Sequence, residues 1–425
     1  MLTTRPRGTQ DVTPADSWKW HYVEDQIRRI TREYHYAELR TPVFEHTELF
    51  ERGVGETTDV VEKEMYTFLD KGGRSLTLRP EGTAPTVRAY LEDGLEGAPQ
   101  PTKVYYLGPI FRYERPQAGR LRQHTQFGVE AFGSQDPALD AEIIHLAWTF
   151  LRRLQLKDLS VNINSIGCPV CRPRHRQALL DHFRPHLGEL CADCQRRFAQ
   201  NPLRLLDCKN EACRAVASQA PVMLEHLCPE CADHFARLQG YLTAFGVEYQ
   251  VNPYIVRGFD YYTKTVFEII YGGLGAQSTV CGGGRYDGLI ELVGGKPTPG
   301  IGFGLGLERL LLTMEKQNVP WPEPAGVTVF VARLGERARE AAPSLVAELR
   351  AAGLGAELDY QGRSLRGQLD YAAKIGARFL AVLGDDELAS GRVKVRELAT
   401  REEREAPLQG LAEWLREWLQ GRTDQ

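Results

Sequence analysis

Four arginines are gathered in one short stretch of the sequence, RYERPQAGRLRQHTQF, which covers residues 112–127. They are Arg112, Arg115, Arg120 and Arg122. The whole chain carries 52 basic and 56 acidic residues, so a general excess of positive charge does not account for the cluster. A run of this kind is usually a solvated loop or a salt-bridged helix face. The alternative is a site for an anionic ligand, because guanidinium groups bind carboxylate and phosphate oxygens through paired hydrogen bonds.

The segments on either side of the arginines favour the anion site. KVYYLGPIF at 103–111 is aromatic and β-branched, as strands prefer, and QHTQFGVEAFG follows at 123–133. We predict two strands joined by a loop that contains Pro and Gly and carries the arginines. Alternation along the second strand places Gln126 and Glu130 on one face and Phe127 on the other. A polar row next to arginines predicts a ligand with both anionic and hydrogen-bonding parts.

A second candidate site is the glycine-rich stretch GIGFGLGLER at 300–309. Its glycines alternate with apolar residues, so a strand here would present one bare face, over which a flat ring could lie close to the backbone. The strand would run directly into a helix that carries Glu308 and Arg309. The spacing does not match a dinucleotide-binding loop, and no βαβ unit follows. The alternative is tight strand packing in a core, but the presence of the arginine site favours a ligand.

Paired tyrosines mark a third candidate. The segment 254–271 is predicted to be a strand, and within it Arg257, Tyr261 and Tyr262 lie close together beside an aspartate. Tyrosines on strands are usually core or interface residues. The neighbouring arginine and aspartate favour a small polar pocket here.

Two predicted turns complete the candidate set. LRPEGT at 78–83 offers Glu81 and Thr83, and Glu81 could hold an ammonium group. An acid at a helix N-terminus is the alternative role, and for Glu81 taken alone it is the stronger interpretation. CGGGRYDGL at 281–289 resembles a glycine turn with one arginine and one aspartate, for which a ligand site and a structural hairpin are equally supported.

Eight of the nine cysteines lie between residues 168 and 231, and the ninth is Cys281. Two CxxC pairs, separated by 19 residues, have a spacing typical of zinc sites. In a reducing cytosol such pairs indicate metal or redox chemistry rather than structural disulfides. The spacing predicts two groups of four, with Cys168, Cys171, Cys191 and Cys194 in the first and Cys208, Cys213, Cys228 and Cys231 in the second.

Length and composition are those of a globular enzyme with several domains. The 425 residues are enough for two or three domains, and 42% of them are hydrophobic. The sequence has no apolar run of about 18 residues and its start lacks the apolar core of a signal peptide, so we expect a cytoplasmic enzyme without membrane contact. The net charge of −4 requires any nucleic-acid contact to use local patches.

The organisation of the chain follows from its prolines and its periodicity. Residues 168–240 are helical in character and are interrupted by the cysteine pairs. The proline-rich stretch 317–326 marks a domain boundary. Beyond it, strand-like and helix-like segments alternate over about 95 residues, which predicts a compact α/β domain.

Taken in order, these motifs resemble those of a known family. GPIFRYERPQAGRLRQHTQFGVEAFG and GIGFGLGLERLLL resemble the second and third motifs of the class II aminoacyl-tRNA synthetases. LRTPVFE resembles the first motif, which forms the dimer interface in that class. RGFDYYTKTVFE and GGGRYDGL resemble the two signature peptides of histidyl-tRNA synthetases. The resemblance runs from RGTQD at 7–11 to the C-terminal domain and covers essentially the whole chain.

The resemblance implies an α+β fold and a two-step reaction. Residues 1–320 would form a catalytic domain on an antiparallel sheet, with a mainly helical domain inserted at 168–245 and an α/β anticodon-binding domain at 327–425. The molecule would be a homodimer. L-histidine and ATP, with Mg²⁺, would give histidyl-adenylate and pyrophosphate. Histidine would then pass to the 3′ end of tRNA(His).

The same resemblance gives roles to the arginines of the site. Arg112 would grip the α-phosphate of a bent ATP, and Arg309 would hold its adenine and γ-phosphate region. Arg257 would neutralise the α-phosphate as charge develops, which makes Arg257 and Arg112 the catalytic residues. These roles agree with the physics of phosphoryl transfer, which needs positioning and fixed positive charge.

The remaining roles implied by the resemblance concern histidine and tRNA. The ammonium and carboxylate groups of histidine would be held by Glu81, Thr83 and Gln126. Its two imidazole nitrogens would bond to Glu130 and Tyr262, with Tyr261 beside them. The loop residues that would reach the tRNA acceptor end are Arg115, Gln117 and Arg120.

The sequence departs from the family pattern in two places. Phe259 stands where the family usually has leucine. The cysteine pairs of the insertion are not a general family requirement, so zinc binding is left open between the spacing, which favours it, and the resemblance, which does not require it.

Three rival classes compete with this interpretation. The regulatory subunit of ATP phosphoribosyltransferase shares the catalytic fold but typically lacks the anticodon-binding domain and parts of the signature set. Arg257, Glu130 and the domain from residue 327 onward count against it. A synthetase of the same subclass for another amino acid is disfavoured by Glu130 together with RGFDYY. A zinc-dependent nucleic-acid-binding module would leave the arginines and glycines unexplained.

Overall fold

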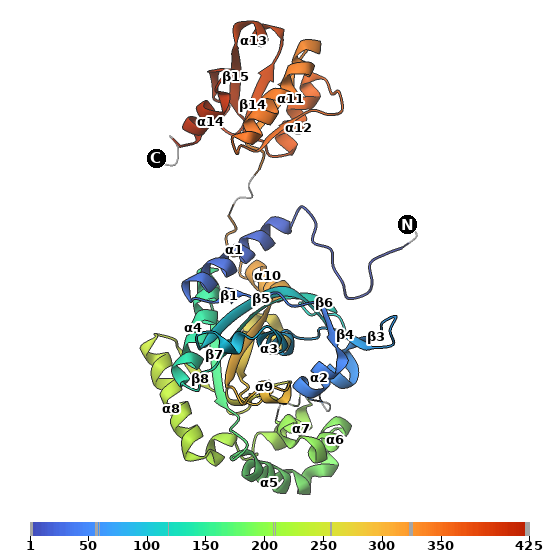
Figure 1. Cartoon of the computed structure of the whole chain (residues 1–425), viewed down its shortest axis with the longest axis vertical. Coiled ribbons are helices and arrows are strands. Elements are labelled where there is room, and N and C mark those ends of the chain that lie inside the picture. The colour runs from blue at the N-terminus through green and yellow to red at the C-terminus, as the bar shows by residue number, and fades with distance from the viewer. Residues whose placement is uncertain are drawn as a thin grey trace. The chain divides into compact units, whose positions relative to one another are not determined.

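The chain divides into two compact units, Met1–Trp321 and Pro322–Gln425 (Figure 1). The computed structural model describes residues 3–55, 58, 60–117, 119–206, 208, 210–255, 257–322 and 326–420. The boundary between the units falls within the predicted linker, of which residues 323–325 lie outside the described residues. No helix in the described part of the chain is long and apolar enough to cross a membrane.

An eight-stranded sheet forms the centre of the first unit (Figure 1). Its strand order is β1–β5–β6–β11–β10–β9–β7–β8. The outermost pairs, β1–β5 and β7–β8, are parallel, and the other neighbours are antiparallel. In spatial order the strands are Ala37–Glu38, Thr102–Phe111, Gln123–Phe132, Gly300–Gly306, Thr279–Arg285, Thr263–Tyr271, Leu159–Ser165 and Tyr249–Val251.

Four helices cover one face of this sheet. They share a buried core with the apolar side chains that alternate along β6 and β11, including Phe127, Val129 and Phe303. Apolar residues at helical spacing give each helix the stripe that it buries. The helices are α1 (Ser17–Glu33), α4 (Pro137–Arg153), α8 (Pro229–Ala244) and α10 (Leu307–Lys316). The sequence alternation that separated Phe127 from Gln126 and Glu130 is therefore confirmed, and the polar row lies on the other face.

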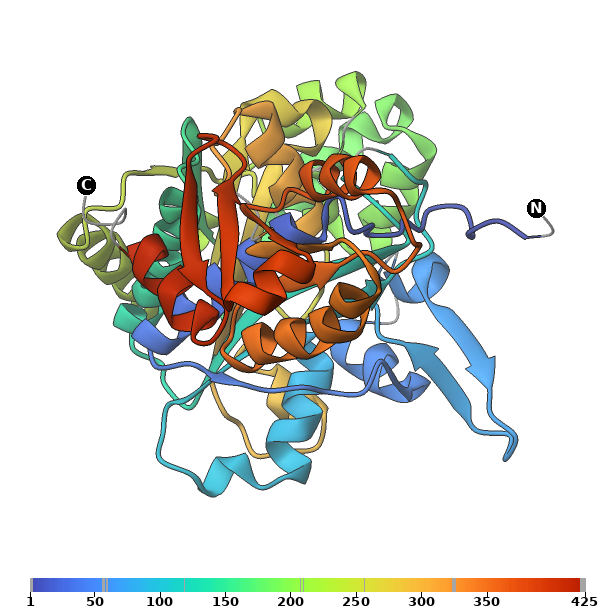
Figure 2. The same ribbon diagram turned by 90° about the horizontal axis from the view of Figure 1, so that it is seen from above.

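A smaller sheet and short helices flank the polar face. The smaller sheet has the order β2–β4–β3, and its β3–β4 hairpin extends outward from the first unit (Figure 2). Its strands are Phe44–His46, Ser75–Leu78 and Tyr66–Leu69. The helices near it are α2 (Thr47–Val54), α3 (Thr83–Glu92) and α9 (Leu289–Leu292). The turn between β4 and α3 is the predicted Pro–Glu–Gly turn, which brings Glu81 to the start of a helix.

The cysteine-rich segment folds as short helices between β7 and β8. These are α5 (Arg172–Phe183), α6 (Ala192–Gln200) and α7 (Glu211–Ala217), followed by α8. Short 3-10 turns connect them at Arg184–Glu189, Pro202–Leu205 and Met223–His226. The helical character expected for residues 168–240 is confirmed.

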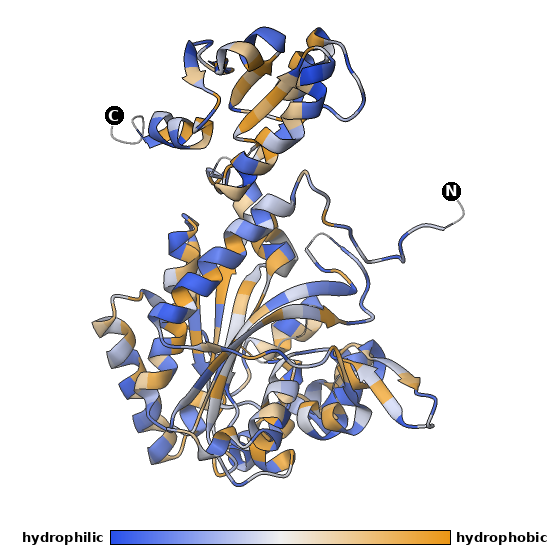
Figure 3. Ribbon diagram, turned by 45° about the horizontal axis from the view of Figure 1, so that its top comes forward, coloured by the Kyte–Doolittle hydropathy of each residue, from blue (hydrophilic) through white to orange (hydrophobic). Residues whose placement is uncertain are grey.

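The C-terminal unit is an α/β domain with its own core. Its five-stranded sheet has the order β13–β12–β14–β15–β16, and its central strands are strongly hydrophobic (Figure 3). The strands are Ala356–Leu358, Val329–Arg333, Phe379–Leu383, Arg392–Glu397 and Glu403–Pro407. Helices α11 (Glu336–Ala351) and α14 (Leu411–Gln420) share one buried core with the sheet, and α12 (Leu365–Lys374) shares another. A short α13 (Asp385–Ser390) precedes β15.

Two predicted elements differ from the structure. The strand expected over 254–271 is confined to Thr263–Tyr271, because the residues before it turn to line a cavity instead of joining the sheet. The glycine turn expected at 281–289 is wrong, since Gly282–Gly284 form part of the central strand β10. An added Cβ at Gly283 would meet the backbone of β11, so the glycines let neighbouring strands approach closely.

Candidate active site

A cavity of about 370 Å³ lies over the polar face of the large sheet. Nine of the twelve predicted site residues line it, namely Glu81, Thr83, Arg112, Arg120, Gln126, Arg257, Tyr261, Tyr262 and Arg309. Glu130 lies directly beneath, hydrogen-bonded to side chains of the lining. Arg115 and Gln117 lie outside the cavity and are exposed. Segments that are far apart in the sequence are thus brought to one site.

Glu130 is a buried acid that forms no ion pair with any described residue. Only 1% of its surface is exposed, and it accepts a 2.7 Å hydrogen bond from the Thr83 hydroxyl and a second from the Tyr286 hydroxyl. Burial raises the pKa of Glu130 to about 8, although both hydrogen bonds oppose the shift. The ligand-free acid therefore holds its proton at neutral pH. A ligand that brings N–H donors to this carboxylate would favour its charged form.

Glu81 lies at a helix N-terminus, which is the role that the sequence favoured for this acid taken alone. Its two carboxylate oxygens accept hydrogen bonds of 2.6 and 2.7 Å from the backbone N–H groups of Thr83 and Ala84, at the start of α3. Burial raises its pKa. Glu81 also lines the cavity, so the helix cap fixes an acid at the edge of the ligand space.

The arginines of the β5–β6 unit face the cavity at its other end. The Arg112 Nε donates a 2.6 Å hydrogen bond to the Pro80 carbonyl, which fixes the guanidinium near the turn that carries Glu81. Glu114 forms an ion pair with Arg120 and lies 3.8 Å from Arg112. Burial, together with the positive charge of Arg112 and Arg309, lowers the pKa of His124 to about 3. A neutral histidine among arginines is the environment expected of an anion site.

Arg309 lies on the same side, from the first turn of α10. Its Nη1 donates a 2.8 Å hydrogen bond to the Thr279 carbonyl on β10. Burial and the nearby charge of Arg120 lower its pKa. The glycine strand that runs into a helix thus delivers Arg309 to the cavity, as the sequence pattern predicted.

Arg257 carries a polar atom that is buried and has no partner in the described part of the chain. Its Nη1 lies 2.5 Å from Glu268 on β9, and its Nε is buried with no hydrogen bond. The guanidinium lies 5.7 Å from the centroid of the Tyr262 ring. A buried donor without a partner is costly, so a ligand oxygen that accepts from this nitrogen would be bound strongly.

One aromatic pair and one cation–π contact frame the remaining wall. The rings of Tyr261 and Tyr262 are 4.7 Å apart and both are buried. Phe259, which stands where the resemblance leads us to expect leucine, places its ring 5.4 Å from the Arg112 guanidinium. This cation–π contact is one that leucine cannot make.

The glycines of β11 leave room for the polar row. Gly302 pairs with Glu130 and Gly304 lies beside Gln126 on the same face. A Cβ at Gly302 would collide with the Glu130 carboxylate, and one at Gly304 would collide with the Gln126 amide. The bare strand face predicted from the alternating glycines therefore accommodates the side chains that form the cavity floor.

Five further residues belong to the site, and of these only Glu308 was named from the sequence, without a role. Tyr286 donates to Glu130, and the Tyr106 hydroxyl lies 3.5 Å from the Gln126 side-chain oxygen. Glu308 accepts hydrogen bonds of 2.9 and 3.0 Å from the Thr125 N–H, and burial raises its pKa to about 7. The others are Glu114 and His124. All five lie in stretches quoted above, Tyr106 in KVYYLGPIF, but which of them face the cavity depends on the tertiary fold.

The residues of the predicted tRNA-contact loop have two different environments in the structure. Arg115 and Gln117 are exposed at its tip, where Gln117 forms an isolated bridge with Arg120. The Arg120 side chain instead turns into the cavity, where it is paired with Glu114.

Eight cysteines form two groups of four whose sulfur atoms lie within 4.8 Å of one another. The neck cluster consists of Cys168, Cys171, Cys228 and Cys231, and the inner cluster consists of Cys191, Cys194, Cys208 and Cys213. The grouping predicted from the sequence is wrong: the first CxxC pair joins the last, and the second CxxC pair joins the two cysteines that follow it. The helices between the pairs fold back on themselves, so sequence order does not set the pairing.

Comparison with known proteins agrees with the fold. The family model described as histidyl-tRNA synthetase matches residues 8–310, and the model of an anticodon-binding domain matches residues 328–418. Together with the antiparallel sheet and its arginine-bearing β5–β6 unit, these matches define a class II aminoacyl-tRNA synthetase with a C-terminal anticodon-binding domain.

Relatives over the full length specify the family. The histidine–tRNA ligase of Moorella thermoacetica is 57% identical over 98% of both chains, and that of Pelotomaculum thermopropionicum is 55% identical over 99% of both. The crystal structure of apo histidyl-tRNA synthetase from S. aureus is 40% identical, covers 97% of this chain and 100% of that one, and has a TM-score of 0.83. The chain belongs to the histidyl-tRNA synthetase family and is an aminoacyl-tRNA ligase.

Proposed function

We propose that this chain activates L-histidine with ATP and transfers it to the 3′ end of tRNA(His), using the residues of the cavity described above. A carboxylate oxygen of histidine attacks the α-phosphorus of ATP, the bond to pyrophosphate breaks, and histidyl-adenylate forms. A ribose hydroxyl at the tRNA 3′ end then attacks the histidyl carbonyl carbon, and AMP leaves. The observation that carries the proposal is the juxtaposition of one buried, cation-free acid, Glu130, with a cluster of arginines in one cavity.

Histidine binds at the acid end of the cavity. Glu130 and Tyr262 bond the two imidazole nitrogens, and Tyr261 lies beside the ring. Glu130 supports this role because it is buried and because its donors among the described residues are the Thr83 and Tyr286 hydroxyl groups. A ligand without a ring N–H would bring no third hydrogen-bond donor to the Glu130 carboxylate. Such a ligand would bind much more weakly, and this difference in affinity would select histidine over other amino acids.

The backbone groups of histidine bind nearer the arginines. Glu81 and Thr83 hold the ammonium group, and Gln126 holds the carboxylate. The helix cap on Glu81 and the short bond from Thr83 to Glu130 fix these side chains before the ligand arrives. Such preorganisation lowers the entropy cost of orienting the carboxylate for attack.

ATP, bound with Mg²⁺, occupies the arginine end. Arg112 holds the α-phosphate, Arg309 holds the adenine and γ-phosphate region, and Arg257 neutralises the charge that develops on the α-phosphate. The buried Nε of Arg257, which lacks a partner, supports this assignment. Arg120 lines the same cavity, so we assign it to the phosphate end as well as to the loop that approaches tRNA.

The parts that contact tRNA lie outside the cavity. Arg115 and Gln117 at the loop tip contact the acceptor end, and the unit from residue 327 to 425 binds the anticodon. Residues 1–320 form the catalytic domain, and residues 168–245 form the insertion within it. The compactness of the C-terminal unit and its separate core support this division.

The functional molecule is a homodimer located in the cytoplasm. The β2–β4–β3 sheet, which includes part of the first class II motif, supports the dimer because it presents exposed apolar side chains. They are Phe44, Phe68 and Leu69, with 48%, 44% and 70% of their surfaces exposed.

Aminoacylation of a tRNA(His) transcript with radiolabelled histidine tests the proposal. Purified protein should charge this transcript and should leave a transcript of another tRNA uncharged. Folded protein that charges neither would favour the regulatory-subunit class, in which a synthetase-like fold carries no ligase activity.

A further inference from the structure

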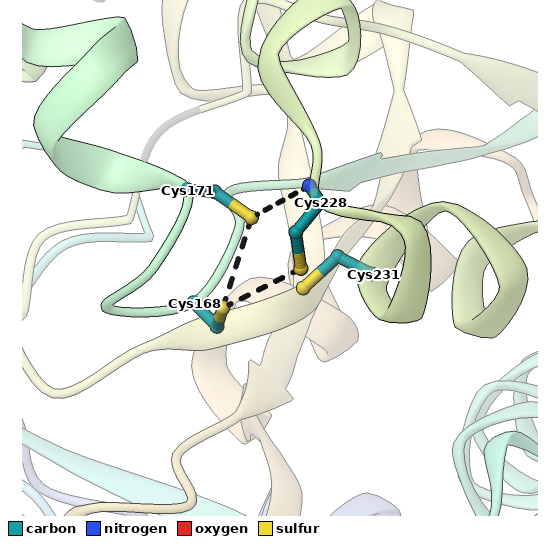
Figure 4. A group of neighbouring side chains, drawn as sticks. All are labelled: Cys168, Cys171, Cys228 and Cys231. Atoms are coloured by element: carbon teal, nitrogen blue, oxygen red, sulfur yellow. Dashed lines mark hydrogen bonds between the residues drawn. The ribbon is translucent and has the colours of Figure 1, made fainter.

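The two cysteine clusters have the spacing of tetrahedral metal sites. In the neck cluster, the Cys168 Sγ lies 3.7 Å from the Cys171 Sγ and 3.9 Å from the Cys228 Sγ (Figure 4). In the inner cluster, the Cys191 Sγ lies 3.9 Å from the Cys208 Sγ. A disulfide would require about 2.05 Å. Four sulfurs placed ~2.3 Å from a central zinc ion are about 3.8 Å apart, which matches the observed distances.

The backbone around both clusters favours thiolates, the form of cysteine that binds metal. Cys171, Cys191 and Cys228 are the N-cap residues of α5, α6 and α8, and a helix N-terminus favours negative charge. The Cys228 N–H donates a 3.1 Å hydrogen bond to the Cys171 Sγ. In the inner cluster the Cys191 N–H donates to the Cys213 Sγ at 3.2 Å. The same N–H to sulfur arrangement thus recurs in two independent clusters.

Cations balance the charge of the neck cluster. Zinc bound by four thiolates carries a net charge of about −2, which a buried site must compensate. Arg172 interacts electrostatically with Cys168 and Cys171, and Lys264 interacts with Cys231. Both cations are held in place, since Arg172 donates to the Tyr262 carbonyl and Lys264 lies 2.7 Å from Glu230.

The insertion has too small an apolar core to fold without reinforcement. Among its described residues the buried cluster contains nine, and two of these, Cys194 and Cys213, belong to the inner cluster. Units of this size usually require a metal or disulfides, because the buried apolar surface barely offsets the entropy of folding. All cysteines in the structure are free thiols, so metal is the available reinforcement.

We propose that the insertion binds two structural zinc ions in nested sites, one in each cluster. The inner ion holds α6 and α7 together within the insertion. The neck ion joins the two ends of the insertion where the chain leaves β7 and re-enters through α8. This proposal goes beyond the ligase activity and does not depend on it.

The neck site also fixes a contact with the active site. Arg172 is the residue after Cys171, and its bond to the Tyr262 carbonyl anchors the tyrosines of the cavity wall. The insertion contacts the same segment a second time, through a 3.0 Å hydrogen bond from Asn201 to Asp260. Loss of the neck ion should therefore weaken histidine binding, whereas loss of the inner ion should chiefly destabilise the insertion.

The zinc content of the full-length protein tests the first part of the proposal. Protein purified without added metal should contain about two zinc ions per chain by mass spectrometry of the elements. X-ray absorption at the zinc edge should show sulfur ligands only. A Cys281→Ser variant is the matched control, because Cys281 lies in β10, outside both clusters, and this variant should keep both ions.

Two double variants distinguish nested pairing, which is the neck and inner clusters of the structure, from consecutive pairing, in which the cysteines group in sequence order as first predicted. C191S/C208S removes two ligands of the inner cluster only, so one ion should survive a challenge with EDTA. C168S/C191S removes one ligand from each cluster, so neither ion should survive the same challenge. Consecutive pairing predicts the reverse, none for the first variant and one for the second, and that result would overturn the nested sites. Folded wild-type protein without zinc, or with disulfides instead of free thiols, would overturn the proposal as a whole.

Discussion

At the scale of single residues, the site depends on charged groups that are buried without their natural partners. Glu130 has hydroxyl donors but no cation, and the Arg257 Nε has no acceptor in the described chain. Leaving such groups incomplete costs stability in the free protein. The histidine imidazole would donate to Glu130, and an α-phosphate oxygen would accept from the Arg257 Nε. The stability that these groups cost the free protein is then recovered as binding energy for the reacting groups.

Replacing Glu130 with glutamine should stabilise the free protein at high pH and abolish its activity. The pKa of Glu130 is raised from 4.5 to about 8, so between these values the acid is ionised in the unfolded chain but protonated in the folded one. Wild-type stability from this group is therefore full below pH 4.5 and falls as the pH rises through 8. Glutamine has no such dependence, so E130Q should gain on the order of 5 kcal/mol over wild type at pH 9.

Chemical denaturation at pH 5 and pH 9 measures this difference. The gain should be small at pH 5 and large at pH 9, while histidine-dependent pyrophosphate exchange falls about 100-fold or more, because glutamine cannot provide the anionic acceptor. An E130Q variant that is equally stable at both pH values relative to wild type would show that Glu130 ionises normally.

Arg257→Ala should impair activation while leaving histidine binding largely intact. The guanidinium is assigned to the α-phosphate, where additional negative charge develops as the reaction proceeds, so its loss should lower kcat about 100-fold or more. Equilibrium dialysis with labelled histidine should give a Kd within a few-fold of wild type. Arg29→Ala, at an exposed position of α1, is the matched control. Normal adenylate formation by the Arg257 variant would contradict its assigned role.

At the scale of elements, the glycines of β11 determine whether the polar row fits. An added methyl at Gly302 would collide with the Glu130 carboxylate and with the Val129 backbone carbonyl, neither of which can move freely. At Gly304 the clash is with the end of the flexible Gln126 side chain. Gly302→Ala should therefore destabilise the protein and abolish histidine exchange, whereas Gly304→Ala should cause a smaller loss.

Thermal unfolding and exchange assays on both variants test this order. Gly97→Ala is a suitable control, because no atom lies within 4 Å of the position that its Cβ would take. Equal losses for Gly302→Ala and Gly304→Ala would show that contact with a rigid neighbour is not what distinguishes the two glycines.

Aromatic and β-branched residues made β5 predictable from the sequence, and regular alternation made β6 and β11 predictable. Each strand buries one apolar face against helices, and that requirement leaves a period of two in the residues. The glycines of β10 hid this alternation. They allow neighbouring strands to approach closely, and the sequence does not reveal which strands are neighbours. The segment before Thr263 contains strand-forming residues but turns toward the ligand space, so tertiary contacts override its local preference.

The site residues also divide into those that a local sequence pattern predicts and those that depend on tertiary contacts. Glu81, Glu130, Arg112 and Arg309 were predictable because they stand in motifs with fixed spacing. Tyr106 was missed because nothing in its strand distinguishes it from a core tyrosine. The pairing of cysteines could not be predicted either, since helices of the insertion fold the first CxxC pair onto the last.

At the scale of the whole molecule, the two compact units should separate chemistry from tRNA selection. Each has its own sheet and its own buried core. A protein that ends at Trp321 should keep amino-acid activation within a few-fold of the full chain. It should lose most of its efficiency in charging tRNA(His), because the anticodon contacts are removed. Pyrophosphate exchange and tRNA charging measured on the same preparation test this, and equal losses in both activities would show that the units depend on each other.

The central claim is that the cavity activates histidine and no other amino acid. ATP–pyrophosphate exchange with the full-length protein, one amino acid at a time and without tRNA, measures this directly. We predict exchange that depends on histidine and is absent with the other amino acids. Exchange with a different amino acid, or none with any amino acid from folded protein, would contradict the account.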